Sequence, residues 1–454
     1  MKKQILTSLI SAGMMLLCGC AEQSSPEHNT PTAESTSSEM TAVVTTEAAQ
    51  KYNYVHGTDG YYNLAEELKH FKMRPQYSGT CWLYAAHASM STAYEKKTGK
   101  ELDFEISQML ASIYGDNKQE GIFVRKGTDK ANIGGCQEYV TEKLSNECMN
   151  GITLDSSLII DPADREAIKS TIKTRGGVAV GIDDCSSKKR FFGSYLTVNY
   201  VQVEAYDHDV TLIGWDDHFP KDYFEVPAAE DGAWIAYNSN ESARYFYISY
   251  CSPLEQAISH TVSDEYSEVL SYDAGNELDT YIQTGDSTKV ANVFHRKGML
   301  AAVGTYNDFD SQDITIEIMS ADLNNVLYTQ EATLNYYGYH TVQLTNPVEA
   351  EDFAVVITYT KGAPVEGEDI EIDIGTYKTS IEKGQSFVFV DGKWKDMADS
   401  DIRTVLRTEK GQSSSLSEND ILRNELTENE IEAILKPDFE PGNCCIKALL
   451  SDIK

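Results

Sequence analysis

The stretch that decides the fold runs from Gln76 to Tyr94 and reads Gln-Tyr-Ser-Gly-Thr-Cys-Trp-Leu-Tyr-Ala-Ala-His-Ala-Ser-Met-Ser-Thr-Ala-Tyr. Its first residues contain a glycine turn, and the Ala-rich remainder predicts a helix that ends near Gly99. Cys81 would then stand at the helix N-terminus, where unpaired N–H groups and the helix dipole stabilise a thiolate. A lone cysteine is more often a small buried hydrophobe, so this position alone does not indicate a nucleophile.

Two later segments supply the partners that a nucleophilic cysteine needs. His208 begins an apolar stretch that predicts a mostly buried strand, and Asn238 ends another such strand. His208 follows Cys81 by 127 residues and Asn238 follows it by 157. These separations bracket those expected for a Cys-His-Asn hydrolase, so three weak signals in the right order favour one catalytic site.

Together these segments resemble the papain family of cysteine peptidases, in particular its bacterial members with a C-terminal lectin-like domain. The resemblance implies an α+β fold, in which a papain-like two-lobed peptidase domain at 51–263 is followed by an all-β sandwich. It implies that Cys81 is the nucleophile and that His208 is its base and later the acid. By the same resemblance Asn238 orients the imidazole, and Gln76 and the backbone N–H of Cys81 stabilise the oxyanion.

The resemblance also assigns substrate-binding residues. Gly134 and Gly135 match a glycine pair whose backbone pairs with the substrate, which requires the close approach that only glycine allows. Taken alone, the pair is as readily a simple turn. The strand 177–181 resembles one that lines the S2 pocket, so Val178 is predicted to bind substrate. No cofactor is implied.

The chain departs from the family pattern in four places. Gln76 precedes Cys81 by five positions where the family usually has six, and Asp209 replaces a small apolar residue. The segment 51–75 is too short for the inhibitory pro-segment of classical members. Asn240 replaces the Trp that normally shields the His-Asn hydrogen bond, which predicts a more hydrated pair unless another aromatic covers it, the candidates being Trp215, Trp234 and Tyr245.

The N-terminus predicts export. Two lysines and an apolar run to Leu17 form a signal peptide within residues 1–20, too short to span a bilayer. The run ends in Leu-Cys-Gly-Cys, which resembles a bacterial lipobox with lipidation at Cys20; an ordinary secretory signal is the alternative. Residues 21–50 are rich in Ser and Thr and contain no Lys, Arg or aromatic residue, which predicts a disordered tether. We therefore expect a lipid-anchored protein on the outer face of the bacterial cell membrane.

The sequence pattern of the second half differs from that of the first. It consists of short stretches in which apolar and polar residues alternate, separated by turn residues, which predicts a lectin-like β-sandwich over 264–454. A capping box and an apolar stripe predict a helical insertion near 412–440. The sequence has no CxxC pair and no complete calcium loop, so no metal site is predicted. The adjacent Cys444 and Cys445 would point to opposite faces of a strand, so we expect at most one of them to pack inward.

Composition limits the partners. The chain has 38 Lys and Arg against 71 Asp and Glu, a formal charge of −33, which disfavours nucleic acid as a partner. The predicted partners are protein or peptide substrates, and the C-terminal domain leaves room for a carbohydrate or cell-wall ligand. The alternative function is a catalytically impaired papain-like domain that acts with the sandwich as an adhesin or ligand-binding surface protein.

Overall fold

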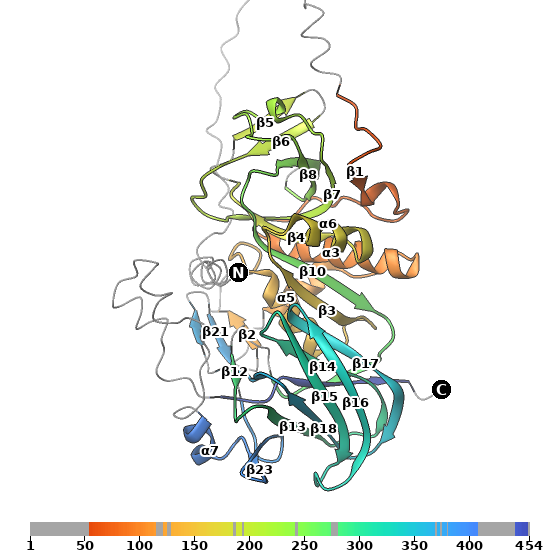
Figure 1. Ribbon diagram of the computed structural model, residues 1–454, viewed down its shortest axis with the longest axis vertical. Coiled ribbons are helices and arrows are strands. Elements are labelled where there is room, and N and C mark those ends of the chain that lie inside the picture. Colours follow the sequence, from red (N-terminus) through yellow and green to blue (C-terminus); the bar gives the residue numbers. More distant parts are fainter. Residues whose placement is uncertain are drawn as a thin grey trace, which may run out of the picture.

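The computed structural model describes residues 54–114, 121–124, 129–184, 188–192, 195–240, 244–273, 280–367, 370–372, 375–378, 380–406 and 441–452 (Figure 1). The signal peptide with Cys20, the tether and the helical insertion near 412–440 therefore lie outside the described residues. Within the described ranges, no helix is long and apolar enough to cross a membrane.

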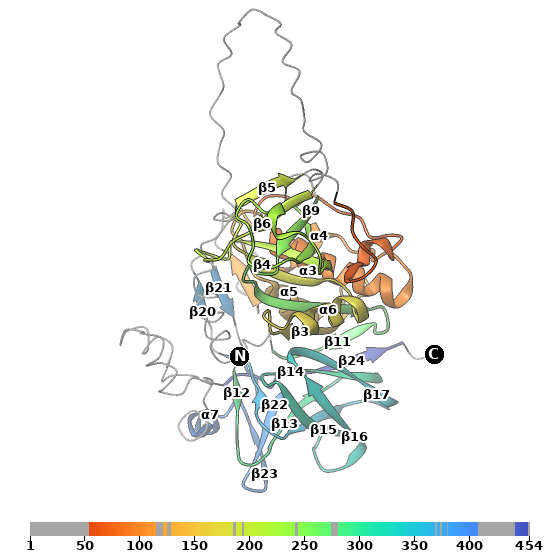
Figure 2. The ribbon, with the colours of Figure 1, turned by 45° about the horizontal axis from the view of Figure 1, so that its top comes forward.

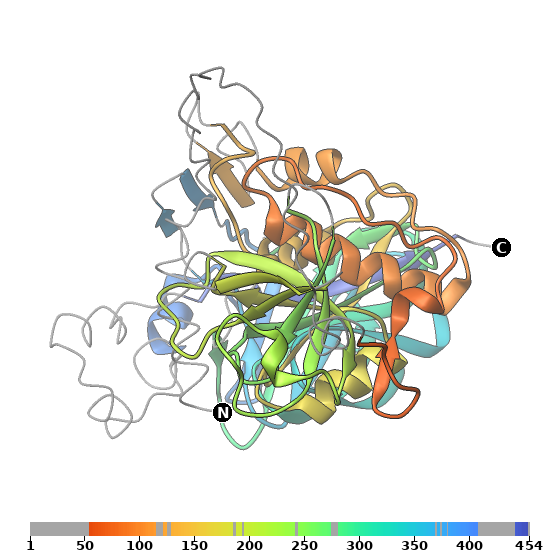
Figure 3. The same cartoon turned by 90° about the horizontal axis from the view of Figure 1, so that it is seen from above.

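The longest helix among the described residues, α3 (Cys81–Thr98), has the bounds that the sequence predicted. It ends at Gly99, which adopts the left-handed conformation (φ 71°) and donates its N–H to the carbonyl of Glu95. Thirteen of its 18 residues are buried, so α3 is covered on several sides. Alanines make this close packing feasible, and Figure 3 shows the helix, in orange, lying against the neighbouring strands.

Shorter helices surround α3. Helices α4 (Ile106–Ile113) and α5 (Gln137–Asn146) share one buried apolar cluster with it. Helix α6 (Arg165–Thr174) begins where the side chain of Asp164 accepts the N–H of Ala167. Two short 3-10 helices, η1 (Leu64–Glu66) and η2 (Lys221–Tyr223), complete this part of the chain.

The strands of the N-terminal half form a sheet beside α3. Its order is β3 (Thr153–Ile160), β10 (Glu255–Ser263), β4 (Val178–Ile182), β7 (His208–Asp216), β8 (Ala233–Asn238), β9 (Arg244–Ser249), β6 (Tyr195–Asn199) and β5 (Lys188–Phe192). The short β1 (Tyr61–Asn63) pairs with the far end of β7. Neighbours are antiparallel except β6 and β9, which are parallel.

The C-terminal half is a β-sandwich, as predicted. One layer contains β11 (Glu268–Leu270), β24 (Ile446–Ser451), β14 (Gly298–Asn307) and β17 (Tyr337–Ala350). The other contains β16 (Val326–Asn335), β15 (Ser311–Ser320), β18 (Phe353–Tyr359), β13 (Thr288–Phe294), β22 (Ser386–Val390) and β23 (Lys393–Asp396). Apolar side chains from both layers form one buried core. The remaining elements are β2 (Gly121–Val124), β12 (Tyr281–Ile282), β19 (Ala363–Pro364), β20 (Ile370–Ile372), β21 (Gly375–Lys378) and α7 (Ser400–Val405).

The two halves share a continuous sheet. Strand β17 of the sandwich pairs antiparallel with β3, from Tyr337 opposite Ile159 to His340 opposite Ser156. The first layer of the sandwich therefore continues into the sheet beside α3, and Figures 1 and 2 show the two halves stacked end to end.

This arrangement corrects the expectation for the two adjacent cysteines. Cys444 belongs to the sandwich core, whereas Cys445 belongs to the apolar cluster that includes α3, and both are fully buried. They do face opposite sides, but each side is covered by a different core. The prediction that at most one packs inward is therefore wrong.

Candidate active site

Cys81 is the first residue of α3 and is 7% exposed. The first turn reads Cys-Trp-Leu-Tyr and contributes no carboxylate, so nothing in that turn opposes a negative charge. Because the N–H groups of a first turn lack intrahelical partners, this end of the helix carries partial positive charge. A thiolate at Cys81 is therefore favoured by its position.

His208 and Asn238 form a hydrogen-bonded pair. His208 begins β7 and Asn238 ends the neighbouring β8, and the Nε2 of His208 lies 2.7 Å from the Oδ1 of Asn238. Because an amide oxygen only accepts, Nε2 carries the hydrogen, and Nδ1 is then the nitrogen that exchanges a proton. The backbone N–H of Asn240 also donates to Oδ1, at 2.9 Å, which fixes the orientation of the amide.

Helix α3 and strand β7 run side by side in the same direction, and two hydrogen bonds establish this. The hydroxyl of Thr211 donates to the carbonyl of Ala85 at 3.0 Å. One turn further along α3, the hydroxyl of Ser89 donates to the carbonyl of Gly177 at 2.6 Å. Val178 of β4 is opposite Leu212 of β7, so Gly177 lies level with the residue that follows Leu212. The contact that comes later in α3 is therefore also the one that comes later in β7.

The same register brings the nucleophile to the histidine. Cys81 precedes Ala85 by one helical turn, about 6 Å along the axis. Asp209 precedes Thr211 by two strand residues, about 7 Å. Cys81 is therefore level with Asp209, the immediate neighbour of His208. The structure thus brings together the three residues that sequence spacing had associated.

Gln76 is held next to the same pair. Its N–H donates to the carbonyl of Ser239 at 2.6 Å, and the hydroxyl of Ser239 donates to its Oε1 at 2.9 Å. Its Nε2 donates to the carbonyl of Ser78 at 2.8 Å, which uses one of two amide hydrogens. The loop from Gln76 to Cys81 is one residue shorter than in the family pattern, and Ser78 within it adopts a positive φ of 55°. Ser239, to which the sequence analysis gave no role, joins Gln76 to its chain neighbour Asn238.

The glycine pair lies against the residue that follows the nucleophile. Gly134 and Gly135 have φ angles of 78° and 152°, and the hydroxyl of Tyr114 donates to the carbonyl of Gly134 at 2.8 Å. A Cβ on Gly135 would lie 2.5 Å from Cε2 of Trp82. Here glycine is required by both conformation and space.

Val178 is not placed to bind substrate. It is fully buried in the core and pairs with Leu212, at the end of β4 away from His208. Gly181, near the other end of β4, pairs with Asp209 and so is the nearer residue to Cys81. The strand was identified correctly, but the substrate-binding assignment of Val178 is wrong because its side chain points into the core.

The expectation of a hydrated His-Asn pair is also wrong. His208 is 3% exposed and Asn238 is 2% exposed. Trp215 and Trp234 pair with each other at the far end of β7 and β8, so they do not provide the cover. Of the three aromatic candidates, only Tyr245 is close, because it pairs with Tyr237, the neighbour of Asn238.

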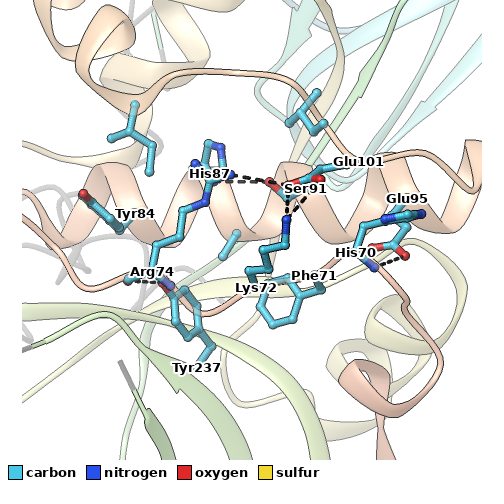
Figure 4. A pocket seen from close by; sticks show the side chains of 13 residues that line it. His70, Phe71, Lys72, Arg74, Tyr84, His87, Ser91, Glu95, Glu101 and Tyr237 are labelled. Atoms are coloured by element: carbon cyan, nitrogen blue, oxygen red, sulfur yellow. Dashed lines mark hydrogen bonds and ion pairs between the residues drawn. The ribbon is translucent and has the colours of Figure 1, made fainter. Parts of the chain in front are cut away.

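A pocket lies beside residues 70–74, the segment that leads to Gln76 (Figure 4). It is lined by the segment around Arg74 and by α3, and Tyr237 closes one side. The hydroxyl of Tyr237 accepts the N–H of Arg74 at 2.8 Å. His87 also lines the pocket, and burial lowers its pKa to about 4, so it is neutral near pH 7. The pocket contains none of the predicted catalytic residues. Among the described residues, no three His, Cys, Asp or Glu side chains are placed to hold a metal ion.

The chain is similar to a protein-family model and to curated relatives. The family model described as "Lectin like domain" matches residues 270–407. Cathepsin S of Rattus norvegicus is 24% identical over 192 residues, which are 38% of this chain and 58% of that protein. Cathepsin S of Bos taurus is 24% identical over 163 residues, 33% of this chain and 48% of that protein. The chain thus spans roughly half the length of the curated relatives it matches.

Solved structures decide the fold. The cysteine protease and lectin-like domains of Cwp84, a surface layer associated protein of Clostridium difficile, superimpose with a TM-score of 0.60 at 16% identity, covering 87% of this chain and 90% of that one. The same protease after propeptide cleavage gives the same TM-score and identity, with 99% of that chain covered. The chain has the fold of a papain-like cysteine peptidase joined to a lectin-like domain. The fold that the resemblance implied is confirmed.

Proposed function

We propose that this protein is a cysteine endopeptidase that hydrolyses peptide bonds through Cys81, His208 and Asn238, with Gln76 in the oxyanion hole. The observation that carries the proposal is the buried 2.7 Å bond between His208 and Asn238, next to the helix N-terminus that begins with Cys81. The similarity to cathepsin S supports the same activity.

The mechanism follows from these positions. The Sγ of Cys81, held as a thiolate by imidazolium and helix dipole, attacks the peptide carbonyl carbon, and the carbonyl oxygen becomes an oxyanion. The backbone N–H of Cys81 and the second Nε2 hydrogen of Gln76 stabilise that charge. Protonated His208 then gives its Nδ1 proton to the leaving amine, and the C–N bond breaks. Water, deprotonated by His208, attacks the thioester and releases the acid and the thiolate.

Asn238 acts by orientation. Its Oδ1 accepts from both Nε2 of His208 and the N–H of Asn240, so the ring is held in one tautomer with Nδ1 toward the nucleophile. Ser239 extends this arrangement to Gln76.

For location we propose export with lipidation at Cys20, a tether at 21–50, and peptidase and sandwich domains at 51–263 and 264–454. The lipobox-like sequence supports the anchor, and the similarity to a surface layer associated protein supports a cell-surface site. The lectin-like domain would supply a carbohydrate or cell-wall contact. Mass spectrometry of the mature N-terminus tests the anchor, because an unmodified N-terminus within the tether would contradict it.

Peptide hydrolysis by the purified ectodomain tests the activity. Wild type should cleave a fluorogenic peptide, and Cys81→Ala should lose that cleavage by roughly four orders of magnitude or more, because no other group replaces the thiolate. Cys251→Ala is the matched control, since it removes a partly exposed cysteine that has no part in the proposed site and should leave the rate unchanged. Absence of cleavage by folded wild type would favour the ligand-binding alternative.

A further inference from the structure

The segment from Arg74 to Gln76 meets the end of β8 but does not join it as a strand. Both edges of β8 are already occupied, since it pairs with β7 on one side and with β9 on the other. Pro75, between the two residues, has no backbone N–H and favours an extended Arg74. The backbone groups of Arg74 therefore need partners other than a strand ladder.

The side chain of Tyr237 in β8 provides those partners. Its hydroxyl accepts the N–H of Arg74 at 2.8 Å and donates to the carbonyl of the same residue (Figure 4). One hydroxyl can do both because it has one hydrogen and two lone pairs. The guanidinium of Arg74 lies 3.8 Å from Glu101 at a partly exposed site, and such a contact adds little. Arg74 is thus fastened to β8 mainly through the Tyr237 hydroxyl.

Tyr237 is itself held in a fixed position. It is 3% exposed, and its ring meets that of Phe71 edge-on, with the centroids 5.6 Å apart. Its backbone pairs with Thr211 of β7 and with Tyr245 of β9. Burial raises the pKa of Tyr237 to about 12, so the hydroxyl keeps its proton near pH 7 and can donate it.

Three consecutive residues at the end of β8 therefore contact different parts of the proposed site. Tyr237 holds Arg74, two residues before Gln76. Asn238 bonds to the catalytic imidazole. Ser239 bonds to both the backbone and the side chain of Gln76. The approach to Gln76 and its amide are thus fixed on the same strand end that orients the imidazole.

We propose that Tyr237 is a positioning residue that fixes the oxyanion-hole amide of Gln76 through the backbone of Arg74. This inference rests on the proposed peptidase activity. Without the hydroxyl, both backbone groups of Arg74 lose their partner. The loop after Gln76 is one residue shorter than in the family pattern, so it has little slack to absorb the resulting shift. A displaced amide would stabilise the oxyanion less, which affects the transition state more than substrate binding.

A double-mutant cycle in the ectodomain, measured with a fluorogenic peptide, tests this route. Tyr237→Phe keeps the ring and removes the hydroxyl, and it should lower kcat roughly 10-fold while KM stays within roughly twofold. Gln76→Ala alone should lower kcat roughly 100-fold or more. Because Tyr237 acts through Gln76, adding Tyr237→Phe to Gln76→Ala should change kcat by less than roughly twofold. A merely structural role would give the same fold-loss in both backgrounds.

Two controls accompany the cycle. Tyr195→Phe is matched, because the hydroxyl of Tyr195 also donates to a backbone carbonyl, that of Tyr54 at 2.9 Å, and it should leave kcat unchanged. Alkylation of Cys81 by iodoacetamide forms no oxyanion, so its rate should be the same in Tyr237→Phe and in wild type. Urea unfolding checks that each variant is folded.

If Tyr237→Phe does not fold, Pro75→Ala decides, because it loosens the same segment at an exposed position. It should lower kcat roughly threefold in the wild-type background and not in Gln76→Ala. Unchanged kcat in the folded variant, equal fold-losses in both backgrounds, slower alkylation of Cys81, or full activity of Gln76→Ala overturns the positioning role while the peptidase stands. Absence of hydrolysis by folded wild type overturns both proposals.

Discussion

Gly135→Ala tests how the glycine pair is fitted against the catalytic helix. The new Cβ would lie 2.5 Å from Cε2 of Trp82 and 2.7 Å from the hydroxyl of Tyr114, about 1 Å inside normal carbon contact. Both rings are almost fully buried, so neither can move freely. We expect overpacking to lower the free energy of unfolding by about 1–3 kcal/mol. Forcing alanine to a φ of 152° should lower it by about 1–3 kcal/mol more.

Gly151→Ala is the matched control, because Gly151 also has a positive φ, 78°, but a Cβ there would meet nothing within 4 Å. The free energy of unfolding of this control should fall only by the cost of placing alanine at a positive φ, about 1–2 kcal/mol. Urea unfolding measures both free energies, and peptide kinetics measures kcat/KM. We expect Gly135→Ala to be the less stable variant and the only one with reduced kcat/KM, since Trp82 follows Cys81. Equal stability and equal activity of the two variants would refute the close packing described above.

Three further predictions follow from the site. Asn240→Trp should not raise kcat, because the pair formed by His208 and Asn238 is already buried; a clear rise in steady-state kcat would show that water does reach it. Ser239→Ala should lower kcat roughly 5- to 10-fold with little change in KM, because the side-chain amide of Gln76 would no longer be held in place. Ser239→Thr keeps the hydroxyl and should retain most of the activity. Equal losses of kcat in both variants would contradict a role of the Ser239 hydroxyl in holding Gln76. Burial lowers the pKa of His87 and of His260 to about 4, so the unfolded chain binds more protons between about pH 6.5 and 4 and stability falls as the pH drops through that window. The loss should reach roughly 3 kcal/mol for each histidine by pH 4, and a flat urea midpoint from pH 7 to 5 would contradict it.

The residues of the proposed catalytic site could be located from the sequence because each has a local signal. Cys81 begins a helix that a glycine turn introduces, and His208 and Asn238 occur at strand ends in the expected order. The sandwich strands were also recognisable, because alternation of apolar residues is a property of each strand alone.

What could not be predicted depends on pairing between distant segments. The alternation in strand 177–181 identifies a strand, but only its register with β7 shows that Gly181, and not Val178, is nearer the nucleophile. Likewise, the burial of Cys445, which immediately precedes β24, depends on the peptidase core, and β17 of the sandwich joins the two halves by pairing with β3. Such non-local contacts leave no periodic pattern in either segment.

The central claim is that Cys81 is a nucleophile activated by the helix N-terminus and by His208. The most direct measurement is the rate of alkylation of the ectodomain by iodoacetamide at pH 5.5, with each labelled cysteine identified by peptide mass mapping. Burial raises the pKa of Cys444 to about 12 and that of Cys445 well above its usual range, so those thiols should stay unlabelled in the folded protein. The account predicts rapid labelling of Cys81 that eliminates peptidase activity and slows roughly 100-fold in His208→Ala. Labelling of Cys81 at pH 5.5 no faster than that of a free thiol, or activity that survives complete labelling, would contradict it.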